Sequence, residues 1–359
     1  MSKFYIDTKL FVKELSPFIR FRQWKRHQMR KIVDAKEYLR ERNIPYEDSL
    51  VKKMRLMAER YQFSFDEFFY LHFQEKTIEE SLTFISDSER IDFGSYLNKS
   101  YNRYIFDDKG ETYKRFKPFY KRDLMPIYSA TDSAIWGGAD FLKEKGRVLI
   151  KPINDGCGRG LRLVDTMLLK DNAEQWIQLC KSYCKGNEGG MVIEEVLFNA
   201  PEVAAFHPSS LNTLRIPTVR FDERVDFFYP FMRFGQGGKV VDNGGAGGII
   251  CAVDVNTGSI VAAADERGNS YTRHPDSGKP LVGFTIPRWE EAKAFAAQLA
   301  HVVPSNRYTG WDLALTTKGW VMIEGNAHGQ FLSQIPLQKG FRKEVNQIMR
   351  ELHLKEFYA

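Results

Sequence analysis

The sequence predicts an α+β fold in which a helical N-terminal segment precedes antiparallel sheets. Up to about residue 100, apolar residues recur at helical spacing between polar linkers. After residue 147, β-rich runs outnumber helical ones, and turn residues join several of them as hairpins. The length of 359 residues suits two or three domains, at roughly 150 residues each.

Four short helices are expected before residue 100. Two follow from apolar periodicity: one over 30–42, and one that runs through Arg60 and is capped by Asp48 or Ser49. Two more begin at capping boxes, in which Ser or Thr and a Glu three residues later bind each other's backbone N–H groups. The capping boxes are Ser64 with Glu67 and Thr77 with Glu80.

Nine strands and three further helices are expected in the rest of the chain. The strands are 147–153, 161–164, 191–197, 214–220, 226–233, 249–255, 260–264, 312–316 and 320–324. The helices are 171–183, 288–301 and 341–352. Turn chemistry at 254–259 and 316–319 predicts two hairpins.

The composition is that of a globular protein. Hydrophobic residues make up 43% of the chain and charged residues 27%, which argues against a disordered or collagen-like chain. No run approaches about 18 apolar residues, and the N-terminus lacks the apolar core of a signal peptide. We therefore expect a cytoplasmic protein whose four cysteines are reduced thiols.

The positive charge gathers near the N-terminus. Residues 1–60 hold 16 Lys and Arg against 8 Asp and Glu, whereas the whole chain has a net charge of +6. Such a segment suits an acidic partner such as a membrane surface, nucleic acid or an anionic polymer, or it is a solvated helical face. Its cations alternate with apolar and acidic residues, so we expect no nucleic acid. Contact with a membrane or a partner enzyme stays open.

A glycine-rich segment, KPINDGCGRG at 151–160, lies between two expected strands. Gly156, Gly158 and Gly160 would let backbone N–H groups approach an anion. Lys151 on the strand edge would reach the same anion. No GK[ST] follows and no helix opens at the glycines, so a Walker loop and a dinucleotide fingerprint are excluded. The segment is either a phosphate cradle or a structural hairpin.

Two adjacent carboxylates, Glu194 and Glu195, end an apolar strand. Both cannot face the core, so one points to a polar cleft or to solvent. Backbone groups here would bind a purine, while Glu202 would hold the ribose hydroxyl groups. The alternative is a solvated strand edge.

Three arginines, Arg215, Arg220 and Arg233, lie on strands that are otherwise apolar. A buried arginine is costly unless it is paired with an anion. A polyphosphate with its metal would be such an anion. The alternative is an internal salt bridge to Asp or Glu.

Three oxygen-bearing side chains are expected to converge near the end of the chain. Asp312 and Glu324 lie on strands joined by a four-residue turn, so they sit side by side. Glu324 and Asn326 are two residues apart on an extended strand and share a face. Hard oxygen ligands suit Mg²⁺, which leaves its other positions to nucleotide phosphates and water.

The order of these segments resembles the ATP-grasp superfamily, most closely its sugar-transfer-associated proteins. The resemblance covers about residues 104–340, and its more specific parts are SLNTLRI, GGAGG and IEGNAHG. It implies an ATP-grasp fold, in which two α+β lobes clamp ATP. The implied parts are a helical region at 1–100, a small lobe with a glycine-rich lid at 101–197 and a large lobe with the metal site at 198–359. The first hundred residues show no β-α-β pattern, so we expect the usual N-terminal lobe, which commonly helps build the acceptor site, to be absent or replaced by helices.

The resemblance also implies roles for the residues named above. The implied nucleotide site is Lys151, Asn154, Gly156, Gly158, Gly160, Glu194, Glu195, Val196 and Glu202. The implied ligands of one or two Mg²⁺ ions are Asp312, Glu324 and Asn326. The implied catalytic residues are Arg215, Arg233 and Asn243. A second nucleotide lysine is expected upstream, with four candidates: Lys109, Lys114, Lys121 and Lys143.

These parts imply an ATP-dependent carboxylate–amine ligase that forms an acyl phosphate. Its expected substrates are small-molecule or glycan carboxylates and amines, such as a carboxylated sugar or an amino acid, in the synthesis of a polysaccharide or a peptide-like product. One alternative is a phosphotransferase of the same fold that forms no amide. Another is a non-catalytic protein that binds an anionic surface. A homodimer is the default expectation for its assembly.

Overall fold

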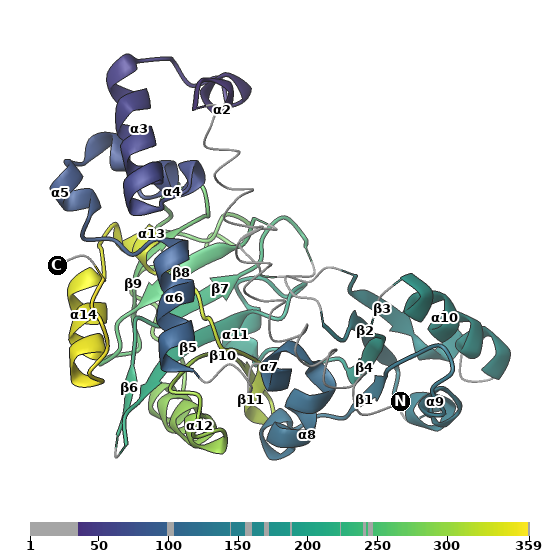
Figure 1. The fold of residues 1–359 in the computed structure, drawn as a ribbon. Helices are drawn as coiled ribbons and strands as arrows, with labels where there is room; N and C mark the ends of the chain where they lie inside the picture. The colour runs from purple at the N-terminus through teal and green to yellow at the C-terminus, as the bar shows by residue number, and fades with distance from the viewer. Residues whose placement is uncertain are drawn as a thin grey trace, which may run out of the picture.

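Two antiparallel sheets and a group of N-terminal helices make up this computed structural model, which describes residues 35–98, 104–143, 145–154, 160–168, 172–186, 189–222, 224–239, 242 and 247–357 (Figure 1). The strands of the smaller sheet lie within 124–195 and those of the larger sheet within 213–326. Helices combined with antiparallel strands confirm the expected α+β class. The domain bounds 1–100, 101–197 and 198–359 stay a prediction.

The N-terminal helices are short, as their polar linkers predict. They are α2 (Ala35–Glu41), α3 (Asp48–Tyr61), α4 (Phe65–Tyr70), the 3₁₀ helix η1 (Phe73–Glu75), α5 (Ile78–Ser81) and α6 (Asp87–Leu97). Both expected capping boxes are present, at the starts of α4 and α5. A third box, Ser86 with Glu89, begins α6. The expected cap of α3 is wrong, because Asp48 is already helical and Glu47 takes the N-cap position without a side-chain hydrogen bond.

These helices pack directly against the larger sheet. A buried apolar cluster joins Met54, Phe68 and Phe73 of the helical segment to Phe231 and Ile250 of the sheet. Burial of apolar surface stabilises such contacts by roughly 25 cal/mol per Å². The helical segment is therefore part of the same core as the sheet, and Figure 1 shows it covering one end of that sheet.

The smaller sheet has the strand order β1–β4–β2–β3. Its strands are β1 (Leu124–Ile127), β2 (Arg147–Pro152), β3 (Arg162–Asp165) and β4 (Met191–Glu195). The expected hairpin around the glycine-rich segment is β2–β3, whereas β1 was not expected from the sequence. The helices of this region are α9 (Ala134–Lys143), the 3₁₀ helix η3 (Thr166–Leu168) and α10 (Ala173–Gly186). Trp176 of α10 is buried, and its Nε1 donates to the carbonyl oxygen of Ile135 in α9 at 2.8 Å.

The larger sheet has the strand order β11–β10–β5–β7–β8–β9, with β6 paired to β5. Its strands are β5 (Thr213–Arg220), β6 (Val225–Phe227), β7 (Phe231–Phe234), β8 (Ile249–Val253), β9 (Ile260–Ala264), β10 (Tyr308–Thr316) and β11 (Gly319–Asn326). Both expected hairpins are present, as β8–β9 and β10–β11. The single strand expected over 226–233 is wrong. Tyr229 has a φ of +46° and Pro230 has no N–H to donate, so the chain breaks into β6 and β7.

Further helices surround the larger sheet. They are α7 (Tyr104–Asp107), α8 (Lys109–Tyr120), α11 (Pro201–Ala204), α12 (Trp289–Val302), α13 (Gln334–Leu337) and α14 (Arg342–Glu351). The helix α8 contacts β11 on one side and β1 on the other, so it lies where the two sheets approach each other. Among the described residues, none forms a helix with the length and apolar character needed to cross a bilayer.

Candidate active site

The hairpin β10–β11 carries the three expected metal ligands, and a β-bulge decides which of them face each other. Nearer the turn, Leu313 lies opposite Met322. An extra residue on β11, Ile323, then shifts the register so that Asp312 lies opposite Glu324. Without the bulge, Asp312 would lie opposite Ile323. The bulge therefore places the two carboxylates together.

Two arginines from neighbouring strands hold Asp312, which is 1% exposed. Arg215 of β5 donates to both carboxylate oxygens, with Nη2 at 2.7 Å from Oδ2. Arg233 of β7 adds a contact from Nη2 to Oδ2 at 3.0 Å. Of the two partners considered from the sequence, the structure shows the internal salt bridge. Arg220 lies elsewhere and donates to backbone carbonyl groups.

The same arginines keep donors available. Nε and Nη2 of Arg215 are used by Asp312, and Nε and Nη2 of Arg233 are used by Thr213 and Asp312. In the described part of the chain, Nη1 of either arginine has no acceptor. A guanidinium that is fixed on one edge and open on the other is a preorganised donor for an anionic group.

The pKa values of the two facing carboxyl groups are shifted in opposite directions. Burial by itself would raise the pKa of Asp312, but Arg215 and Arg233 hold it well below its usual range. Burial and the neighbouring charge of Asp312 raise the pKa of Glu324. The arginines are closest to Asp312, so Glu324 is the group that a further cation would stabilise most.

The chemistry of these donors fits Mg²⁺. Asn326 donates through Nδ2 to the carbonyl oxygen of Gly310 and to Glu324, both at 3.4 Å, and its own side-chain oxygen receives no hydrogen bond from the described residues. Within the described ranges, no three His, Cys, Asp or Glu side chains gather into a metal site. A magnesium ion at this place would be held by carboxylate oxygens of Asp312 and Glu324 and the amide oxygen of Asn326.

A third acidic residue, Asp242, contacts Arg233 and was not singled out from the sequence. Its Oδ2 accepts from the backbone N of Thr213 at 2.8 Å and lies 3.6 Å from Nε of Arg233. Burial raises its pKa. Asp242 directly precedes Asn243, one of the expected catalytic residues, which lies outside the described residues. The clue available in the sequence was its place at the start of the glycine-rich stretch DNGGAGG.

In the smaller sheet, one buried carboxylate organises the expected nucleotide residues. Glu194 of β4 is 3% exposed and forms a salt bridge through Oε1 with Lys151 of β2. Its Oε2 accepts from Nε and Nη2 of Arg122 at 3.1 and 3.0 Å. Despite burial, Lys151 and Arg122 lower the pKa of Glu194 to about 2. This shared counter-ion fixes the position of Lys151 on the sheet.

Arg122 also connects the two sheets. Its Nη1 donates at 2.7 Å to the carbonyl oxygen of Met322, two residues before Glu324. The sequence analysis missed Arg122, which lies just before the unexpected strand β1. The connection is reinforced by Glu195, whose carboxylate accepts from Nζ of Lys318 at 3.1 Å. Glu194 and Glu195 therefore lie where the two sheets meet.

The remaining expected nucleotide residues are spread around this place. Val196 is half-buried just after β4, and Asn154 is exposed at the end of β2 beside Gly189. Gly160 has a φ of +68° close to Pro152. Glu202 is exposed on α11 and has no hydrogen bond or ion pair with the described residues. Two expected lid residues, Gly156 and Gly158, lie outside the described residues.

One of the four candidate lysines lies against the glycine-rich segment. Nζ of Lys109, at the start of α8, donates to the carbonyl oxygens of Pro152 and Ile153 at 2.9 and 3.4 Å. Nζ of Lys121 instead donates to the carbonyl oxygen of Lys318. Among the candidates whose side chains the structure describes, Lys109 is therefore the one held at the end of β2, the strand that carries Lys151.

The sequence was compared with models of known protein families. An ATP-grasp family model matches residues 88–350, which is most of the chain, so this is a protein of the ATP-grasp class. Within that class, the chain belongs to the family described as sugar-transfer associated ATP-grasp. The match confirms both the resemblance and the expected fold, and it begins within α6 of the N-terminal helical segment. None of the curated proteins compared matches the sequence.

Solved structures with a similar fold are distant in sequence. D-alanyl-alanine synthetase A from Vibrio cholerae O1 biovar eltor str. N16961 is 11% identical over 67% of this chain and 62% of its own, with a TM-score of 0.40. N5-carboxyaminoimidazole ribonucleotide synthetase from Thermotoga maritima is 11% identical over 77% of this chain and 58% of its own, with a TM-score of 0.40. VanG D-Ala:D-Ser ligase from Enterococcus faecalis is 10% identical over 70% of this chain and 63% of its own, with a TM-score of 0.44. The chain thus spans less than two thirds of each of these proteins, and the family assignment rests on the sequence match.

Proposed function

We propose that this protein is an ATP-dependent carboxylate–amine ligase that acts through an acyl phosphate. The observation that carries the proposal is the cluster around Asp312, in which two buried arginines keep open donors beside the oxygen ligands Glu324 and Asn326. Such a cluster suits an anionic group that carries a metal. The substrates we propose are a carboxylated sugar or an amino acid and an amine, in the synthesis of a polysaccharide or a peptide-like product.

The reaction needs no nucleophile from the protein. A carboxylate oxygen attacks the γ-phosphorus of ATP, the bond to the bridging oxygen breaks, and ADP leaves. The amine nitrogen then attacks the acyl carbon, the bond from that carbon to the phosphate oxygen breaks, and phosphate leaves with the amine proton passing to solvent. Catalysis then depends on positioning and on charge stabilisation.

The arginines are suited to the transferred phosphoryl group. Nη1 of Arg215 and Nη1 of Arg233 would donate to its oxygens while Asp312 keeps both guanidinium planes in place. Glu324 and Asn326, with Asp312, would hold Mg²⁺. When bound, this ion neutralises charge on the phosphate oxygens.

The nucleotide would lie between the two sheets. Lys151 is held by Glu194 and Lys109 by the carbonyl groups of Pro152 and Ile153, so both ammonium groups are positioned near the glycine-rich lid. We propose that they bind the ATP phosphates and that the backbone of Glu195 and Val196 binds adenine. We also propose that the carboxylate of Glu202 binds the ribose hydroxyl groups.

The proposal is tested by measuring ADP and phosphate release with Mg²⁺ over a panel of carboxylates crossed with amines. Hydroxylamine is added in a parallel series, because it converts an acyl phosphate to a hydroxamate that can be identified by mass. A ligase releases phosphate only with a carboxylate and gives a hydroxamate. A stable phosphorylated product would identify a phosphotransferase instead, and no binding of Mg-ATP would favour the non-catalytic alternative.

Glu324→Gln separates the metal site from the fold. The change keeps the size and removes one charge, so we expect turnover to fall by at least about a hundredfold. The melting temperature should stay the same or rise, because a buried carboxyl group next to Asp312 is removed. Glu290→Gln, on the exposed side of α12, is the matched control and should change neither. Normal turnover by folded Glu324→Gln would contradict the proposed metal site.

A further inference from the structure

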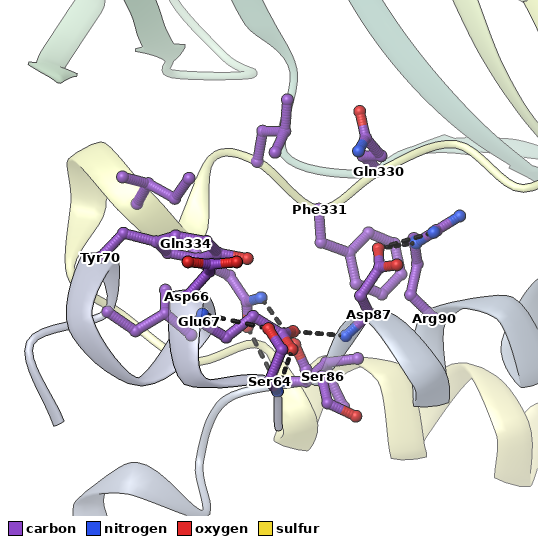
Figure 2. Close-up of a pocket in the computed structure, with 14 residues that line it drawn as sticks. Ser64, Asp66, Glu67, Tyr70, Ser86, Asp87, Arg90, Gln330, Phe331 and Gln334 are labelled. Atoms are coloured by element: carbon purple, nitrogen blue, oxygen red, sulfur yellow. Dashed lines mark hydrogen bonds and ion pairs between the residues drawn. The ribbon is translucent and has the colours of Figure 1, made fainter. Parts of the chain in front are cut away.

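A cavity of about 240 Å³ lies between the N-terminal helices and the segment that follows β11. Figure 2 shows Glu67 at the α4 side and the paired Asp87 and Arg90 of α6 beside Phe331. Gln330 lies at its edge, on the segment after β11. Neither the nucleotide site nor the metal site uses any of these residues.

The cavity adjoins the end of the hairpin that carries the proposed metal ligands. Gly310 is the register partner of Asn326, and a Cβ on Gly310 would lie 3.1 Å from Cα of Gly329. Gln330 is the next residue, and consecutive Cα atoms are about 3.8 Å apart. The edge of the cavity is therefore one residue from the backbone that touches the metal-binding strands.

The charges that line the cavity are mainly negative. Asp66, Glu67 and Asp87 contribute carboxylates, whereas Arg90 is the one cation among the described lining residues. Arg90 is already engaged, because Nε and Nη2 donate to Asp87 at 2.9 and 2.6 Å and Nη1 donates to the carbonyl oxygen of His328. Asp66 is paired as well, since its Oδ1 accepts from Nη2 of Arg42 at 2.9 Å. Glu67 is therefore the lining carboxylate that has no cationic partner among the described residues.

Glu67 is the deepest of these acids and has no cationic partner. It is 4% exposed, and its two oxygens accept backbone N–H groups of Ser64 at 2.7 Å and Asp87 at 2.6 Å. Burial and the charge of Asp87 raise the pKa of Glu67 to about 7. A cation in the cavity would offset this repulsion, whereas an anion would increase it.

The rest of the lining is suited to a hydrophilic molecule. The hydroxyl group of Tyr70 has no hydrogen-bond partner among the described residues, and Gln330 offers an exposed amide at the edge. The ring of Phe331 supplies an apolar wall. Hydroxyl, amide and aromatic groups together bind small polyhydroxylated molecules through hydrogen bonds and ring contact.

We propose that this cavity is the acceptor pocket and that it binds a small hydrophilic primary amine in its ammonium form, next to Asp87 and Glu67. This assignment rests on the proposed ligase function, because it supplies that reaction with its amine. It also gives the N-terminal helices a direct part in the site, since α4 and α6 form two of the cavity walls.

The test compares amines with alcohols of the same size. Ligand-observed NMR and calorimetry on the full chain are run with glucosamine against glucose and with ethanolamine against ethylene glycol, near pH 6.5. We expect saturable binding of at least one amine and at least tenfold weaker binding of its alcohol. Gln330→Lys places an ammonium group at the edge and should weaken amine binding at least tenfold. Gln347→Lys, exposed on α14, is the matched control and should bind like the wild type.

Asp87→Asn is the second variant, read together with its melting curve and its affinity for ATP. We expect weaker amine binding with unchanged ATP affinity. The assignment of the acceptor pocket is overturned if neither amine binds saturably, or if Gln330→Lys binds the amine as tightly as the wild type does. If carboxylates still give a hydroxamate from ATP in that case, the ligase function stands without it. Amine binding that Gln330→Lys removes, in a protein without ATP turnover, would keep the pocket and overturn the ligase function.

Discussion

Lys151 and Arg122 bind the two oxygens of one buried carboxylate, Glu194, so the three side chains act together. An ammonium group held in this way is already in position for the nucleotide that we propose it binds. That preorganisation reduces the loss of side-chain entropy on binding.

We predict that Lys151→Ala weakens ATP binding and leaves the fold intact, because Arg122 still neutralises Glu194. A charge-assisted contact is worth about 1.5–3 kcal/mol, which corresponds to roughly ten- to a hundredfold in affinity. Calorimetric titration with Mg-ATP measures the change. Lys318→Ala, which removes an exposed partner of Glu195, is the control and should bind ATP as the wild type does. Equal affinities of all three proteins would show that Lys151 is structural.

We predict that Glu194 makes stability depend on pH in the acid range. Its pKa falls from 4.5 to about 2 on folding, so its contribution is complete above pH 4.5 and is lost as the pH falls through about 2. The full contribution is about 3 kcal/mol. Urea unfolding of wild type and Glu194→Gln at pH 6 and pH 2.5 measures it. The difference in the free energy of unfolding should be larger at pH 6, and a constant difference would contradict the prediction.

Residues whose partners are close in sequence could be predicted, and those with distant partners could not. The capping boxes at Ser64 and Thr77 were predicted because each involves a Glu three residues away. The salt bridge of Arg215 with Asp312 joins β5 to β10, 97 residues apart, so the sequence left its partner open. Arg122 was missed for the same reason, since Glu194 and Met322, which it binds at the site, are 72 and 200 residues away.

At the scale of the elements, the sequence pattern predicted part of the hairpin β10–β11 and missed another part. The turn at 316–319 predicted the pairing, and the period of two predicted that Glu324 and Asn326 share a face. The bulge at Ile323, which brings Glu324 opposite Asp312, has no marker such as glycine in the sequence. The strand β1 was also missed, because its four residues, LMPI, are too few to show alternation and include a proline.

We predict opposite effects for two glycines of the small-sheet region. Gly190 has a φ of +93°, and a Cβ there would overlap the carbonyl oxygen of Ile127 and lie 2.7 Å from Cα of Tyr128. Gly190→Ala should therefore lower the free energy of unfolding by at least about 2 kcal/mol. Gly137→Ala lies in α9 with no atom within 4 Å of the added Cβ, so it should be neutral or raise stability by up to about 1 kcal/mol. Chemical denaturation measures both, and equal effects would contradict the assigned backbone at Gly190.

At the scale of the whole molecule, the N-terminal helices and the larger sheet share one apolar core. Phe68 of the helices and Phe231 of the sheet belong to one buried cluster, so each part shields the apolar side chains of the other from solvent. The basic charge of residues 1–60 is therefore carried in part by helices whose other face is buried. We still predict that nucleic acid is not a partner. Binding through phosphate contacts falls steeply with salt, and a salt titration with DNA or RNA should show no such binding.

We predict that a chain beginning at residue 99 loses cooperative unfolding. It would expose the apolar side chains of β7, β8 and β9 that the helices cover, including Phe231, Ile250 and Ala264. Thermal melting and binding of a hydrophobic dye measure the effect. A chain beginning at residue 35 keeps α2 to α6 and serves as the control. A sharp melting transition in the shorter chain would show that the sheet is stable without the helices.

The contact of Arg122 with the carbonyl oxygen of Met322 has a mechanical consequence. The chain enters the smaller sheet just after Asp123 and leaves it at Glu195, and these two points are joined by a hydrogen bond of 3.1 Å from Glu195 N to Asp123 O. These two adjacent points define an axis about which the smaller sheet could rotate relative to the larger one. Arg122 lies next to this axis and contacts both sheets. Rotation of the smaller sheet about this axis would move its edge strand β3 most, while moving Glu194 little relative to β11. The smaller sheet could then turn without disturbing the spacing between Lys151 and the strand that carries Glu324.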